Sequence, residues 1–389
     1  DPQAEAYLRM DARSLLVARR ADQGARTDRA LTRRDINTGQ AMWEVPSFRA
    51  LFTERSRRPF PAADERIETP LRSQVPASEL VVLIDDRTMI LLDRVGRAAS
   101  FDYDSGRLLW AAELGVDRVY DAAMSDGALV VAGTPARPAR SPDEPAKPDE
   151  SAPEEQTVCI VQVVGARTGV SQGTIPEPTD VRWVTLSDDG ALAYATEQQI
   201  VLADTARVEA RWRHESAPLT DSFEGWSVQG RVIVRDRNGR LHALDAATGQ
   251  PASAPFDTLG KSDQAFVDAS LVTLGQRTAL VTTRGLVIHD AAGAIVAADA
   301  LGRDTVVYPP QLGQTAAAIV ETGPAESPDP GMIDGGLFNV HVVSLASGKA
   351  LGQARIELPR APSAVAIADG VIVVSCGSAC VVLSAPAAP

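Results

Sequence analysis

The sequence has 389 residues, of which 44% are hydrophobic and 23% are charged, and its formal net charge is −13. This composition is that of an ordinary globular protein and excludes a disordered or collagen-like chain. The acidic surplus argues against nucleic-acid binding, which needs clustered Lys and Arg. No apolar run approaches the roughly 18 residues of a membrane-spanning helix, so we expect no membrane span.

The chain begins at Asp1, without Met and without a signal-like segment. We therefore expect a mature chain or a piece of a longer one, with any targeting signal outside this sequence. Only three of the 38 basic residues are lysines, Lys147, Lys261 and Lys349, and alanine is abundant. This bias is typical of a GC-rich bacterial genome.

A short turn phrase recurs along the chain. It reads Asp-Ile-Asn-Thr-Gly at 35–39, Asp-Tyr-Asp-Ser-Gly at 102–106 and Asp-Ala-Ala-Thr-Gly at 245–249. Weaker copies stand at 166–169, 204–207, 290–293 and 344–348, and a degenerate one lies near Ser384. Asp and Thr side chains stabilise such a turn, and Gly supplies its positive φ. Runs rich in β-formers precede each turn and predict antiparallel hairpins.

The spacing of this phrase defines the repeat unit. Equivalent positions are 35, 102, 165, 204, 245, 290, 344 and 384. The three long intervals contain segments that do not resemble strands, at 49–76, 134–156 and 323–336. Without them the unit is about 40 residues, the length of a four-stranded propeller blade. We predict an all-β fold: one domain, 1–389, forming an eight-bladed β-propeller of four-stranded antiparallel blades.

In this prediction the first and last blades are neighbours in the ring. We expect the inner strand of the first blade between Ala6 and Asp11. The last unit ends after its third strand, near Ser384. We expect residues at the chain start to supply its fourth strand; the alternative is that this strand lies upstream of Asp1.

Two stretches carry a resemblance to a known family. Residues 241–250 (Leu-His-Ala-Leu-Asp-Ala-Ala-Thr-Gly-Gln) and 101–110 (Phe-Asp-Tyr-Asp-Ser-Gly-Arg-Leu-Leu-Trp) resemble the repeat of pyrroloquinoline-quinone (PQQ)-type β-propellers. The resemblance implies that the phrase joins the third and fourth strands of a blade. It also implies that Trp43, Trp110 and Trp212, each eight residues after the Asp, lie on outer strands with one shared structural role. The family includes quinoprotein dehydrogenases and the propeller lipoprotein of outer-membrane protein assembly.

Strand order predicts that all three insertions project from one face. The first follows an outer strand, and the others interrupt hairpins between second and third strands. The short Asp turns then lie on the opposite face, with residues 187–190. The Pro-rich, acidic segment 135–156 is expected to be disordered, and segment 49–76, with Leu51 and Phe52, to fold onto the ring. The insertions are either tolerated surface loops or a recognition face.

Cysteine and histidine provide few sites. Cys376 and Cys380 flank a Gly-Ser-Ala turn, which leaves a disulfide, two thiols or a metal ligand pair open. His242 and His341 occupy matching third-strand positions, for which we expect packing or a hydrogen bond within the blade. No zinc, triad or phosphate-loop motif appears, so we predict no metal and no catalytic residue.

A ligand of a propeller would bind at the mouth of the ring, where the inner strands start on the insertion face. Candidate recognition residues there combine aromatic and charged side chains: Arg118, Tyr120, Arg182, Trp183, Glu224, Trp226, Asp268 and Tyr308. Phe266 and Asp304 lie near them. The alternative for Trp183 and Trp226 is packing between blades.

Two functions remain open. The first is a non-enzymatic, monomeric binding or scaffold module of the bacterial envelope, periplasmic or tethered to the membrane, with a protein partner and no cofactor. The second is a PQQ- and Ca²⁺-dependent quinoprotein oxidoreductase, which the resemblance alone implies; fold does not imply function.

Overall fold

The computed structural model describes most of the chain as β-strands. It describes residues 6–11, 13–20, 29–52, 80–125, 127–136, 159–187, 189–215, 224–228, 230–236, 240–252, 269–274, 277–282, 285–290, 294–300, 306–312, 316–322, 336–360, 362, 364–368, 371–376 and 380–384.

The described strands form eight antiparallel sheets, each built from strands consecutive in the chain. The first two sheets are β1 (Ala6–Met10), β2 (Ser14–Arg20), β3 (Arg29–Asp35), β4 (Ala41–Val45) and β5 (Leu80–Ile84), β6 (Thr88–Asp93), β7 (Arg97–Asp102), β8 (Leu108–Glu113). The third and fourth are β9 (Val116–Ser125), β10 (Ala128–Pro135), β11 (Cys159–Gly165), β12 (Ser171–Glu177) and β13 (Val181–Leu186), β14 (Ala191–Thr196), β15 (Ile200–Asp204), β16 (Glu209–His214).

The second half of the chain repeats this order. The fifth and sixth sheets are β17 (Glu224–Val228), β18 (Arg231–Arg235), β19 (Leu241–Asp245) and β20 (Ala269–Leu274), β21 (Arg277–Thr282), β22 (Gly285–His289), β23 (Ile295–Ala300). The seventh and eighth are β24 (Val306–Leu312), β25 (Ala316–Thr322), β26 (Gly336–Ser344), β27 (Ala350–Leu358) and β28 (Ala364–Ala368), β29 (Val371–Ser375), β30 (Cys380–Ser384). The all-β prediction is confirmed, and β1 lies where the first inner strand was expected.

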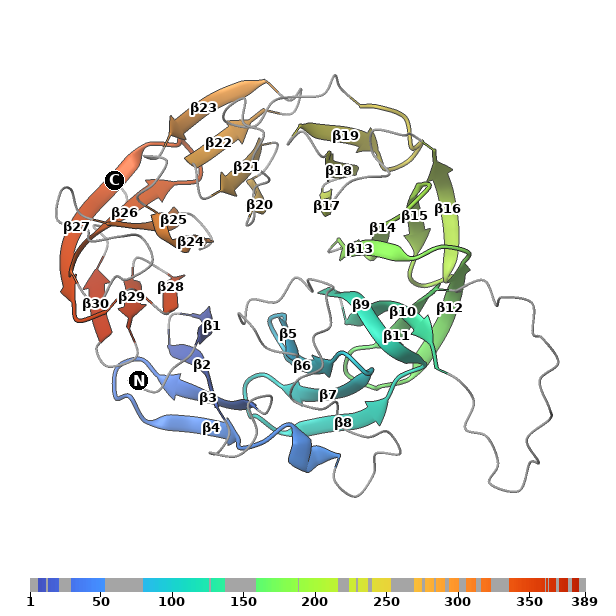
Figure 1. The fold of residues 1–389 in the computed structure, drawn as a ribbon, viewed down its shortest axis with the longest axis horizontal. Coiled ribbons are helices and arrows are strands. Elements are labelled where there is room, and N and C mark those ends of the chain that lie inside the picture. Colours follow the sequence, from blue (N-terminus) through green and yellow to red (C-terminus); the bar gives the residue numbers. More distant parts are fainter. Residues whose placement is uncertain are drawn as a thin grey trace.

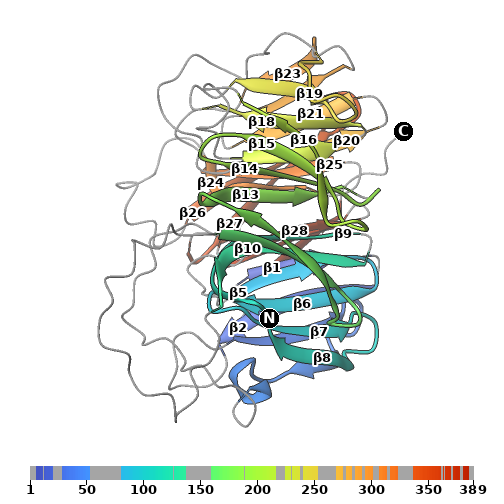
Figure 2. The same cartoon turned by 90° about the vertical axis from the view of Figure 1, so that its right-hand side faces the viewer.

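The sheets follow one another around a central axis, with the first strand of each nearest the centre (Figure 1). Seen from the side, the strands run across the thickness of the molecule (Figure 2). The first and eighth sheets pack together, because β1 contacts β28 and Met10 and Val17 share a buried cluster with Ala366 and Val373. The arrangement is therefore propeller-like.

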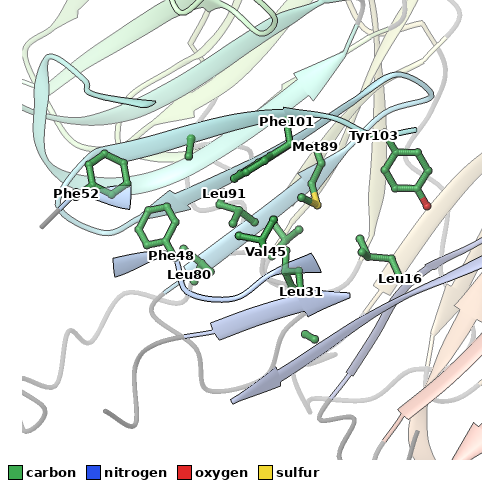
Figure 3. Close-up of a cluster of buried hydrophobic side chains, with 13 residues drawn as sticks. Leu16, Leu31, Val45, Phe48, Phe52, Leu80, Met89, Leu91, Phe101 and Tyr103 are labelled. Atoms are coloured by element: carbon green, nitrogen blue, oxygen red, sulfur yellow. The ribbon is translucent and has the colours of Figure 1, made fainter. Parts of the chain in front are cut away.

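The core lies between neighbouring sheets. Between the first two, Leu16 and Leu31 pack with Leu80 and Met89 (Figure 3). Similar clusters join most of the other neighbours. Middle strands are covered on both faces, so β6 reads Thr-Met-Ile-Leu-Leu-Asp and is buried throughout. Outer strands have one solvent-facing side, and β16 accordingly alternates between exposed and partly buried residues.

The recurring phrase forms the turn between third and fourth strands, as the resemblance implied. In the first sheet, Asp35 Oδ1 accepts N–H bonds from Asn37 and Thr38, at 2.9 and 2.8 Å. The Gly39 N–H donates to the Asp35 carbonyl at 2.8 Å, and Gly39 has a φ of 69°. We call these structures the Asp turns.

The three repeated tryptophans dock on the turn between the third and fourth strands of the next sheet, which begins with Asp102, Gly165 or Asp245. The indole N–H of Trp43 donates to the Tyr103 carbonyl at 3.0 Å, and a Cβ at Gly106 would lie 2.5 Å from the Trp43 ring. Trp110 and Trp212 repeat both features on the next sheets, bonding the carbonyls of Ala166 and Ala246 and covering Gly169 and Gly249. The shared role predicted for the three residues is confirmed; each is half-buried.

At the junction of the third and fourth sheets, a small residue replaces the tryptophan and a larger residue replaces the turn glycine. Gly173 stands eight residues after Gly165, where a Trp would be, and Val208 stands where the other turns have Gly. Val208 has a φ of 54°, and it is the one non-glycine residue with positive φ among those described. A Cβ at Gly173 would lie 3.2 Å from the Val208 side chain. The small residue and the large one have exchanged places.

The insertions emerge where strand order predicted. They join β4 to β5, β10 to β11 and β25 to β26, and antiparallel order brings these ends to one face, which we call the insertion face. Their limits need correction: β10 extends to Pro135, and β26 begins at Gly336. The first insertion opens with a 3₁₀ helix, Arg49–Leu51, and Phe52 is buried, as expected for a segment that packs on the ring.

Several expectations lie outside the described residues. They include most of the three insertions and residues 1–5, where a fourth strand for the eighth sheet was expected. Among the described strands, the fifth and eighth sheets have three each.

Candidate functional site on the insertion face

Three neighbouring inner strands carry most of the predicted recognition residues. β13 contacts both β9 and β17, so Arg118 and Tyr120 on β9, Arg182 and Trp183 on β13, and Glu224 and Trp226 on β17 lie in adjoining strands. Tyr308 is on β24, in the seventh sheet and away from these three strands (Figure 1). Asp268, Phe266 and Asp304 lie outside the described residues.

Arg118 and Tyr120 form a pair on β9. The Arg118 guanidinium lies 5.7 Å from the centre of the Tyr120 ring, within cation–π range. Arg118 is exposed, whereas Tyr120 is buried. Burial raises the pKa of Tyr120 to about 12, and Asp180, which hydrogen-bonds it, adds to the rise. Tyr120 is therefore a neutral hydrogen-bonding group.

Asp121, which sequence reasoning missed, fixes β9 against β13. It is buried, and its Oδ2 accepts the Val184 N–H at 2.8 Å while its Oδ1 accepts the Ala122 N–H at 2.9 Å. The sequence feature that could have identified it is a single carboxylate in an otherwise apolar run, Val-Tyr-Asp-Ala-Ala. A buried carboxylate needs such donors.

The two tryptophans pack between sheets. Trp183 is only 1% exposed, and a Cβ at Gly225 would overlap its ring. Trp226 is half-buried and packs against Ile233, Leu241 and Leu280. The packing alternative describes both indoles.

The charged residues beside them have carboxylate neighbours. Arg182 Nη2 lies 4.0 Å from Glu197 Oε1. Arg235 Nη2 lies 3.4 Å from Glu224 Oε2, with both side chains largely buried. The charged residues described at the inner ends of these sheets therefore carry both signs, and the Arg235–Glu224 pair is largely buried.

A second polar cluster, also missed from sequence, joins the outer strands of the third and fourth sheets. Glu177 is 1% exposed and accepts the Tyr194 hydroxyl at 2.6 Å. Arg213 donates to both oxygens of the same carboxylate, at 2.9 and 3.1 Å. Burial, and then Glu177, raises the pKa of Tyr194. The hydrogen bond to Glu177 raises the pKa of Arg213. This cluster holds two sheets together.

The cysteines are thiols in the structure. Cys376 is buried and Cys380 exposed, and β30 pairs Cys380 with Ser375. The strand register does not set the two cysteines directly opposite each other, and the disulfide stays a prediction. Burial raises the pKa of the Cys159 thiol to about 11, so it is protonated near neutral pH and unreactive.

The described part of the chain contains no group of three or more His, Cys, Asp or Glu side chains placed to hold a metal ion. Within the same residues, no helix has the length and apolar character that crossing a membrane requires.

Comparison with known proteins supports the fold. No protein-family model matches the sequence, and no curated protein matches it. Among solved structures, the computationally designed Ika8 protein is similar with a TM-score of 0.59 and 11% identity, covering 98% of this chain and 96% of its own. BamB from Moraxella catarrhalis is similar with a TM-score of 0.52 and 14% identity, covering 97% of this chain and 93% of its own. These likenesses concern the fold alone.

Proposed function

We propose that the chain is a single eight-bladed β-propeller domain of a bacterial envelope protein. In this proposal it is monomeric, has no cofactor and catalyses no reaction, and it binds a protein partner through its insertion face. One observation carries the proposal: the three long segments all join strand ends at the same face. Long loops on a compact scaffold often carry binding.

The side chains of that face support protein recognition. Exposed Arg118 beside Tyr120, and Arg182 beside Glu197, can exchange their present contacts for hydrogen bonds and ion pairs with a partner. Arg and Tyr are enriched at the centres of protein interfaces. The opposite face consists of short Asp turns whose carboxylates are already bonded to their own turns.

Site-specific photo-crosslinking tests this proposal. A photoreactive residue at position 118 or 182 should crosslink to the same protein in a bacterial envelope extract. Matched positions on the opposite face, Asn37 and Thr248, are also exposed and should yield no such product. Equal products from both faces would refute the insertion face as the docking surface.

The oxidoreductase alternative has its own test. The purified chain is incubated with PQQ and Ca²⁺, and bound chromophore and dye-linked alcohol oxidation are measured. A stoichiometric quinone complex with activity would replace the scaffold proposal. We expect neither signal.

A further inference from the structure

The junction between the third and fourth sheets is fastened differently from its neighbours. Of the four junctions between the first five sheets, the other three have an indole docked on a turn glycine. Here Gly173 of β12 meets Val208 in the turn 204–208 of the fourth sheet. Among the described residues, no hydrogen bond joins the segment 165–174 to this turn. The outer rim of the junction is therefore joined by apolar contact alone.

Val208 occupies the turn position at which the neighbouring junctions have Gly. Its N–H donates to the Asp204 carbonyl at 2.8 Å, as the turn glycines do to theirs. Its φ of 54° is one that a β-branched residue rarely adopts, and its side chain packs on the cluster shared by the two sheets. Such a conformation persists only while the surrounding packing imposes it. Opening of the rim would therefore release backbone strain.

Two other parts of the same junction are held by buried carboxylates. At the insertion-face end of β12, Arg213 donates to both oxygens of Glu177, at 2.9 and 3.1 Å, and the Tyr194 hydroxyl donates to one of them at 2.6 Å. Between the inner strands, the Val184 N–H donates to Asp121 Oδ2 at 2.8 Å. Breaking such contacts would leave a buried charge without its partners. These two parts are therefore harder to open than the rim.

We propose that the third and fourth sheets hinge about these carboxylates. On the face of the Asp turns, β12 and the turn 204–208 separate locally, while the inner strands β9 and β13 stay together. Arg118 and Tyr120 lie on the third sheet and Arg182 on the fourth, so the hinge varies the spacing of these residues for a partner. Only this last step rests on the proposed function.

Hydrogen exchange measured residue by residue with NMR on the intact chain tests the hinge. Four turns share one probe, the N–H that donates to the carbonyl of the first turn residue: those of Gly106, Gly169, Val208 and Gly249. After correction for intrinsic exchange rates, Val208 should be less protected than the three glycines by about tenfold or more, because local opening exposes it. The Val184 amide, on the closed side of the hinge, should be at least as protected as that of Gly106.

A docked indole should close the rim. In the double variant Gly173→Trp/Val208→Gly, protection of the amide at position 208 should rise to the range of Gly106 and Gly249. Val170→Trp is the matched control, because Val170 lies three residues before Gly173 and is 63% exposed. It adds an indole outside the docking position and should leave the protection of Val208 unchanged.

The carboxylate side of the hinge has its own variant. Arg213→Gln leaves the charge of Glu177 buried without its guanidinium, so protection of the Val184 amide should fall by about tenfold or more. Arg213→Lys, which keeps the charge, should lose less. Glu209→Gln, at an exposed residue of the same strand β16, should change nothing.

Three results would overturn the inference. Equal protection of Val208, Gly106 and Gly249 in the unmodified chain would exclude local opening of the rim. A Val184 amide that exchanges as fast as that of Val208 would mean that the two sheets separate completely. An unchanged rate at position 208 in the double variant would remove the strained turn as the cause.

The hinge and the proposed function fail separately. Each of the three results leaves crosslinking at Arg118 and Arg182 as a test of the insertion face. Absence of that crosslink would remove the effect of the hinge on a partner, and the exchange rates would still measure the hinge itself.

Discussion

Each docked indole combines ring packing on a glycine with one hydrogen bond to a backbone carbonyl. For Trp110 the two partners are Gly169 and the Ala166 carbonyl, 2.9 Å away. Trp110→Ala should lower the free energy of unfolding by about 2–3 kcal/mol, below the range for a fully buried Trp because the residue is half-buried. Trp110→Phe keeps ring packing and should lose about 1 kcal/mol.

Chemical denaturation measures both changes. Arg107→Ala, at an exposed residue three positions before Trp110, is the control and should change stability by less than about 0.5 kcal/mol. A loss for Trp110→Ala no greater than that of the control would show that the indole contributes nothing to holding the sheets.

The pKa of Asp102 leads to a prediction about the stability of the fold at low pH. Arg167 of the third sheet donates a hydrogen bond of 3.0 Å to Asp102 of the second sheet. This bond, and then the bonds from Ser105, lower the pKa of Asp102 from 3.8 to about 2. A depressed carboxyl pKa stabilises the fold above the unfolded value, and this contribution is lost as pH falls through about 2. Arg167→Gln should therefore raise the pKa of Asp102 and flatten the loss of stability between pH 4 and pH 2.

Carboxyl NMR titration measures the pKa of Asp102 directly. Asp245 is the internal control, because hydrogen bonds of its own turn, first from Thr248, lower its pKa. Arg167→Gln should leave the titration of Asp245 unchanged. An unshifted Asp102 would place the cause in its own turn rather than in Arg167.

At the scale of elements, the exchange between Gly173 and Val208 can be reversed. Gly173→Trp alone should destabilise the protein, because the Val208 side chain occupies the space beside it. Val208→Gly alone relieves an unfavourable backbone conformation but leaves a gap. The double variant should restore an indole docked on a glycine, with the Thr205 carbonyl as acceptor.

A double-mutant cycle measures this coupling. We expect the double variant to be more stable than the sum of the two single changes by about 1–3 kcal/mol. Additive effects would mean that the outer strands of the third and fourth sheets cannot reproduce the docking of the other junctions. The Glu177–Arg213 cluster, which remains in all variants, then holds this junction without help from an indole.

At the scale of the whole molecule, the ring should not depend on its second insertion. β10 and β11 pair from Ala128 with Gly165 to Gly133 with Ile160, so the hairpin is complete without the loop. The segment 137–157 contains five prolines and six acidic residues, a composition that buries little surface. Replacing residues 138–156 with a short Gly-Ser linker should leave the melting temperature nearly unchanged.

Calorimetry tests this replacement. The deletion leaves Ala136, whose N–H donates to the Gly115 carbonyl at 2.8 Å, as an anchor. A large fall in melting temperature would show that the loop is part of the folded core. A matched replacement of the buried pair Phe48 and Phe52 by Ala should lower the melting temperature substantially.

The sequence by itself determined the features that are local. The Asp turns follow from side chains that bond their own backbone and from glycines at positive φ, so 35–39, 102–106 and 245–249 could be recognised without any distant contact. These turns recur about every 40 residues once the three insertions are left out. Together with the resemblance to PQQ-type propellers, this repeat predicted the strand order, the face of the insertions and the common role of Trp43, Trp110 and Trp212.

Only the tertiary structure decided what depends on the neighbouring sheet. Trp183 looked like a recognition residue until Gly225 of the next sheet placed it in the core. Asp121 and Glu177 gave little signal, because their partners, Val184 and Arg213, are 63 and 36 residues away.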